Sequence, residues 1–91
     1  MTVRVEHTVQ IWKEGDTYVA RAVPLDVMSC GDSAEEARQK LTEAVDLFLK
    51  TAVSHGTLTE VLEECGYVRE GDAWRAPTLL LSETVTQAVH A

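Results

Sequence analysis

The chain has little of several residue types that define particular protein classes. Its 91 residues include only two cysteines and eight basic side chains. Cys30 and Cys65 stand alone, with no C-x-x-C pair and no cysteine–histidine cluster, so the sequence indicates neither a disulfide scaffold nor a zinc site. We expect both residues to be buried thiols.

Long apolar runs and positive charge are also missing. The longest runs, such as residues 79–81, fall far short of the roughly 20 residues that a membrane helix needs. The N-terminus lacks the apolar stretch of a signal peptide, so we expect a cytoplasmic protein. Fifteen acidic against eight basic side chains give a net charge of -7, which is the wrong sign for coating phosphate backbones. Binding of DNA by the isolated chain is therefore not expected.

Strict alternation of apolar and polar side chains over residues 3–13 is typical of a half-buried strand. A two-residue turn at positions 15 and 16 then leads into a second strand over residues 18–23. This register pairs Trp12 with Val19 on one face of the hairpin. Pro24 ends the second strand because it cannot donate to a ladder, and a short third strand follows over residues 27–30.

Two helices are indicated by capping patterns. Ser33 and Glu36 form an S-x-x-E capping box ahead of a helix over residues 34–54, and Gly56 ends it. Thr57 and Glu60 repeat the capping-box spacing, which predicts a short second helix that ends at the glycine in position 66.

The C-terminal region contains a second hairpin. Residues 67–77 repeat the basic-Glu-Gly-Asp-x-aromatic order of the first turn, and Trp74 is the aromatic residue of that repeat. The sequence thus predicts an α+β fold, in which a small antiparallel sheet (a hairpin plus a short strand) packs on one long helix. A short second helix and a further hairpin complete a single domain over residues 1–77. Residues 78–91 form a C-terminal tail that could be β, but no cap, turn or period fixes its structure.

The first half of the chain is similar to a known family. The order of hairpin, short strand and capped helix, carried by Tyr18–Pro24, Ser29–Ala37 and Glu43–Leu49, resembles the HicB-like antitoxin family over about residues 3–50. The loop after Pro24 is shorter than the Pro-Glu-Leu-Pro-Gly-Cys loop usual in the family. The resemblance implies a truncated RNase H-like fold, a homodimer or larger assembly, and a protein that occludes a small basic HicA-type mRNA-cleaving toxin. Many members carry an added DNA-binding segment, which the short acidic remainder of this chain does not provide.

Catalytic chemistry has weak support in the sequence. An RNase H-like fold suggests metal-binding carboxylates, but we interpret the candidate acidic residues as surface or capping residues. His7 is interpreted as a satisfied core or interface histidine, and no serine or cysteine has an identifiable base. We therefore expect no enzyme, cofactor or metal site. A metal-dependent nuclease is the weakest alternative, and the candidate acids are Glu6, Glu35, Glu36, Glu43 and Asp46.

A partner surface is the better-supported hypothesis. Trp12, Val19 and Trp74 are the candidate partner-binding residues, because a hairpin with apolar residues on both faces must cover the second face. The second helix, the tail, another subunit or a foreign partner could supply that cover. An acidic surface beside such aromatics suits a basic partner, although acidity alone also serves solubility. The alternative function is a stand-alone HicB-like homo-oligomeric structural or ligand-binding module.

Overall fold

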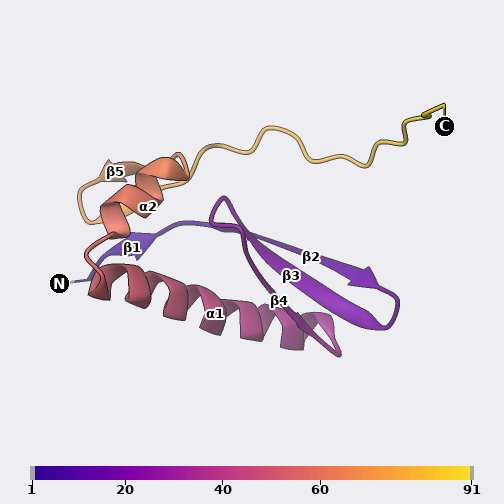
Figure 1. The fold of residues 1–91 in the computed structure, drawn as a ribbon, viewed down its shortest axis with the longest axis horizontal. Coiled ribbons are helices and arrows are strands. Elements are labelled where there is room, and N and C mark those ends of the chain that lie inside the picture. Colours follow the sequence, from indigo (N-terminus) through magenta and orange to yellow (C-terminus); the bar gives the residue numbers. More distant parts are fainter. Residues whose placement is uncertain (1, 91) are drawn as a thin grey trace.

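Two helices and two three-stranded sheets make up the fold in a computed structural model, which describes residues 2–90 (Figure 1). The predicted α+β class is confirmed: one long helix packs on a small antiparallel sheet, and a short helix and a hairpin follow. The predicted hairpin and its short strand form one sheet, and the further hairpin belongs to a second, separate sheet.

The first sheet is antiparallel, with the order β2-β3-β4. It consists of β2 (Thr8–Glu14), β3 (Thr17–Val23) and β4 (Val27–Gly31). The predicted hairpin register is confirmed, because Trp12 lies opposite Val19 and a two-residue turn joins the strands. Gly15 has a φ of 60° in that turn, a conformation that glycine adopts without strain.

Helix α1 (Ala34–Ser54) covers one face of this sheet and has the bounds predicted for it. The Ser33 hydroxyl accepts a hydrogen bond from the backbone N–H of Glu36 at 3.0 Å, so the predicted cap forms. The buried side chains of α1, such as Leu41 at 1 % exposure, pack against Ala20 and Ala22 of β3, which are fully buried. These small residues bring the helix close to the sheet.

The second sheet joins the two ends of the domain. It has the order β1-β6-β5, with β1 (Arg4–Val5) parallel to β6 (Ala73–Arg75) and β6 antiparallel to β5 (Val68–Glu70). The continuous strand predicted over residues 3–13 is wrong, because it breaks at positions 6 and 7.

Hydrogen bonds at Glu6 explain the break. Its carbonyl accepts a hydrogen bond from the Tyr67 hydroxyl, and its carboxylate accepts from Arg75 and from the Ala76 N–H, each at 3.1 Å. These bonds hold the start of the chain to the C-terminal hairpin, 61 to 70 positions away in sequence. Local alternation contains no information about such a partner.

Helix α2 (Leu58–Glu64) exists as predicted, but its capping box does not form. Thr57 makes no side-chain cap bond, and its hydroxyl donates instead to the Ala52 carbonyl at 3.4 Å. The backbone N–H of Thr57 also donates to that carbonyl, at 2.9 Å, so this residue serves the tight connection from α1. Neither described helix is long and apolar enough to cross a membrane.

The segment over residues 76–90 contains no helix or strand, and every side chain from Pro77 onward is exposed. Figure 1 shows it leaving the body beside α2 and extending past the first sheet. Its first residues, Pro77 to Leu79, line a small pocket together with Thr8, Val23 and Pro24 of the body.

Candidate protein-binding surface

The face of the first sheet that points away from α1 brings two of the predicted partner residues together. Side chains alternate across a sheet, so the neighbours of the buried residues Ala20 and Ala22 point to the opposite side. No helix covers that side along β2 to β4 in the described part of the chain (Figure 1). We call it the outer face, defined by Gln10, Trp12, Val19, Arg21, Met28 and Cys30.

A row of three side chains crosses the outer face. Trp12 of β2, Val19 of β3 and Cys30 of β4 occupy paired positions on adjacent strands. Val19 is only 7 % exposed because neighbours flank it on both sides, whereas Trp12 is half-buried and Met28 is 53 % exposed. The prediction that both cysteines are buried is wrong, because Cys30 is exposed on this face and Cys65 is only half-buried. The row forms a mostly apolar surface on a rigid sheet.

Carboxylates surround the turn end of this sheet. Glu14 and Asp16 lie at the β2–β3 turn, while Asp32 and Glu35 lie at the start of α1. The two groups share one end of the sheet because Gly31, the last residue of β4, pairs with the start of β3. None of the four carboxylates forms an ion pair within residues 2–90, and we call them the acidic end.

Most of the basic side chains already interact with other side chains of the chain. Ion pairs of 2.8 to 3.2 Å hold five of them, and two more lie over the rings of Tyr18 and Trp74. In one of these pairs, the hydrogen bond from Lys40 lowers the pKa of Glu36. The five paired residues are Arg4, Arg21, Lys40, Lys50 and Arg75. The acidic end therefore presents carboxylates without ion-pair partners, whereas the one charged residue of the outer face is Arg21, which is paired with Asp26 at 2.9 Å.

Trp74, the third residue predicted to bind a partner, does not lie on this surface. It is 5 % exposed and lies in the core cluster, packed with Leu62 and Tyr67. The pairing of β6 between β1 and β5 buries the residue, and the Arg69 guanidinium lies 5.9 Å from the centre of its ring. The further hairpin predicted from the sequence gains β1 as a third strand, which the local sequence pattern did not indicate.

His7 and Glu6 also differ from their predicted environments. His7 lies between β1 and β2, and its buried Nδ1 has no hydrogen-bond partner in the described structure, so it is not the satisfied histidine predicted. The Glu6 carboxylate is held by Arg75 and Ala76. Within residues 2–90, no three histidine, cysteine or acidic side chains are placed so that they could share a metal ion.

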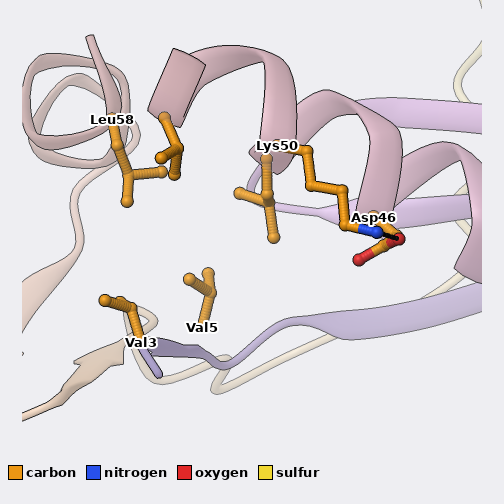
Figure 2. A pocket seen from close by; sticks show the side chains of 7 residues that line it. Val3, Val5, Asp46, Lys50 and Leu58 are labelled. Atoms are coloured by element: carbon orange, nitrogen blue, oxygen red, sulfur yellow. Dashed lines mark ion pairs between the residues drawn. The ribbon is translucent and has the colours of Figure 1, made fainter. Parts of the chain in front are cut away.

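A second surface feature, a groove of about 410 Å³, lies between β1 and the two helices (Figure 2). Val3 and Val5 point into it from one side, and the opposite wall carries Leu49, Val53 and Leu58. Lys50 and Asp46 form an ion pair of 2.8 Å at one end of the groove. The alternating pattern gave no signal for this groove, because it depends on the break between β1 and β2.

The fold and the surface define an α+β protein with an apolar row beside an acidic end. Comparison with protein-family models found no match, and neither did comparison with curated proteins or with solved structures.

Proposed function

We propose that this chain is an antitoxin-like protein that binds and occludes a small basic HicA-type mRNA-cleaving toxin. The observation that carries the proposal is the apolar row of Trp12, Val19 and Cys30 on the outer face, directly beside the acidic end. The resemblance of residues 3–50 to HicB-like antitoxins gives the partner its identity. The protein acts by binding in this proposal, and it has no catalytic residues.

The two parts of the surface have different physical roles. Unpaired carboxylates attract a cationic protein over a distance and raise the association rate, which salt reduces. Apolar side chains that lose water on contact supply most of the lasting energy, and tryptophan is enriched among such anchors. Trp12 is accordingly the residue that would hold the toxin, with the toxin's catalytic and RNA-binding surface covered. Val19, which is only 7 % exposed, supports the Trp12 side chain from the adjacent strand.

Binding kinetics test this proposal. With a HicA-type toxin immobilised, Trp12→Ala should speed dissociation by about tenfold or more and leave the association rate nearly unchanged. Leu47→Ala is the matched control, because Leu47 is an exposed apolar residue of α1, 67 % exposed and off the outer face. Equal effects of the two substitutions would contradict the assignment of the outer face. Tight binding to promoter DNA at physiological salt, without binding to any toxin encoded beside it, would replace the proposal with a DNA regulator.

A stand-alone homo-oligomeric structural or ligand-binding module is the second candidate function. The apolar groove beside β1 and the exposed tail favour it, because both suit association between copies. A neighbouring reading frame for a short basic protein with one central histidine would separate the two candidates in favour of the antitoxin. We place either function in the cytoplasm, where the two free cysteines would stay reduced.

A further inference from the structure

We infer that two copies of this chain exchange tails, and that the leucine run of one copy, Leu79–Leu81, fills the groove beside β1 of the other. This inference concerns the groove and the tail, not the outer face, so it does not depend on the proposed toxin.

Beyond Leu79, the tail is a mainly apolar segment in which every described side chain is exposed. Leu80 is 90 % exposed, Leu81 is 67 % exposed, and Val85 and Val89 are 63 % and 88 % exposed. Such side chains at consecutive positions of one segment mark a surface that another element covers.

The groove fits the leucine run in shape and chemistry. Its two facing walls are mainly apolar, with Val5 of β1 and the preceding Val3 on one side and with leucines and a valine of the helices on the other (Figure 2). Strands that are covered on both faces have continuous apolar runs, and Leu79–Leu81 is such a run. The groove volume of about 410 Å³ lies within the range of about 300–1,000 Å³ that ligand sites occupy. Strand β1 is also an edge strand, paired only with β6, so a docked segment has a free edge beside it.

The geometry favours a second copy over the chain's own tail. The tail passes Thr8 and Val23, whose side chains lie on the outer side of the first sheet, whereas the groove lies on the α1 side. It then runs toward the turn end of that sheet, away from β1 and α2 (Figure 1). Residues 78–90 contain only one residue of the types that favour tight turns, Ser82, and no glycine, proline, asparagine or aspartate. The tail would have to reverse direction without them to enter its own groove.

Two chains of net charge -7 repel each other, but the tails add little to this repulsion. Residues 78–90 carry one acidic side chain, Glu83, and no lysine or arginine. The leucine run brings no charge into the groove, and the polar residues that follow it can lie beside the exposed Lys50–Asp46 pair. Reciprocal exchange closes a two-fold symmetric dimer in which both grooves are filled.

Light scattering with size exclusion tests the exchange on the full chain. The wild type should have twice the 10.0 kDa mass of one chain, and Leu80→Asp should weaken the dimer at least about tenfold. Val53→Asp in the groove should have the same effect, since Val53 is 61 % exposed and its substitution leaves the core intact. Val89→Asp, as exposed as Leu80 but outside the leucine run, and Met28→Asp on the outer face are the controls and should leave the dimer in place. A monomeric wild type at all concentrations, or equal weakening by the controls, would overturn the inference.

A photocrosslinking amino acid at position 80 identifies the occupant directly. The expected product is a covalent dimer whose crosslink maps to residues 3–5 or 49–58 of the other copy. A crosslink to those residues within a single chain, or a dimer crosslinked only at the outer face, would contradict tail exchange. Neither result would affect the toxin proposal, because that is tested at Trp12 with a separate ligand.

Discussion

At the scale of single residues, the two tryptophans have opposite environments despite similar turns beside them. Trp74 is 5 % exposed in the core, while Trp12 is half-buried on the outer face. We expect Trp74→Ala to lower the free energy of unfolding by about 3–5 kcal/mol, the usual cost of truncating a buried aromatic side chain. Trp12→Ala should lower the free energy of unfolding by less than about half of that amount. Urea unfolding of both variants checks this, and a larger cost at Trp12 would mean that the outer face is part of the core.

Tyr67 gives the stability of the domain a dependence on alkaline pH. Burial, with Cys65 and Glu6 nearby, raises the pKa of its hydroxyl from 10.0 to about 12. The folded state holds this proton more tightly than the unfolded chain does. The stabilisation is therefore complete below pH 10.0 and is lost as the pH rises toward about 12.

Unfolding measured across that pH range tests the role of Tyr67. Tyr67→Phe should be less stable at neutral pH, because it loses the hydrogen bond to the Glu6 carbonyl, but its stability should fall less steeply above pH 10.0. Tyr18→Phe, which removes the other tyrosine hydroxyl, is the control and should keep the steep decline. Identical slopes for all three proteins would remove Tyr67 as the cause.

At the scale of elements, the two helix starts differ in how they are capped. Ser33 accepts a hydrogen bond from Glu36, whereas the Thr57 hydroxyl accepts none from α2. We expect Ser33→Ala to lower the free energy of unfolding by about 1 kcal/mol, and Thr57→Ala by clearly less, since its long bond to Ala52 is weaker. Denaturant midpoints of the two variants make the comparison, and an equal or larger loss at Thr57 would contradict it.

The close approach of β4 to α1 depends on Gly31. A Cβ atom there would lie 2.9 Å from the backbone nitrogen of Ala37, which cannot move without shifting the first turn of the helix. Gly31→Ala should therefore cost about 1–3 kcal/mol of stability. Gly15→Asn is the comparison, because its turn is open and asparagine tolerates positive φ. Thermal unfolding distinguishes them, and an unchanged melting temperature for Gly31→Ala would show that the helix can move away.

Local sequence patterns predicted the elements that local forces determine. The β2–β3 register follows from alternation and a two-residue turn, and the bounds of α1 follow from Ser33 and Gly56. The pairing of β1 with β6 was not predictable in this way, since it joins positions nearly 70 residues apart through Glu6, Arg75 and Tyr67. The same pairing buries Trp74 and forms one wall of the groove, so the unexpected burial of this residue and the missed surface have one physical cause.

At the scale of the whole molecule, charge is distributed unevenly over the surface. Seven of the eight basic side chains are held in ion pairs or over aromatic rings, while carboxylates gather at the acidic end and along α2. The central claim is that the acidic end and the outer face act together on a cationic protein. If so, the rate of association with that protein depends on where the carboxylates lie, and not only on the net charge of the chain.

The most direct measurement compares two variants of equal net charge. One neutralises the acidic end with Glu14→Gln, Asp16→Asn and Asp32→Asn, and the other neutralises α2 with Glu60→Gln, Glu63→Gln and Glu64→Gln. Each changes the net charge from -7 to -4, because three carboxylates are removed. At low salt, the acidic-end variant should associate with a HicA-type toxin several-fold more slowly than the α2 variant, and added salt should remove the difference. Equal association rates for the two variants at low salt would contradict the account.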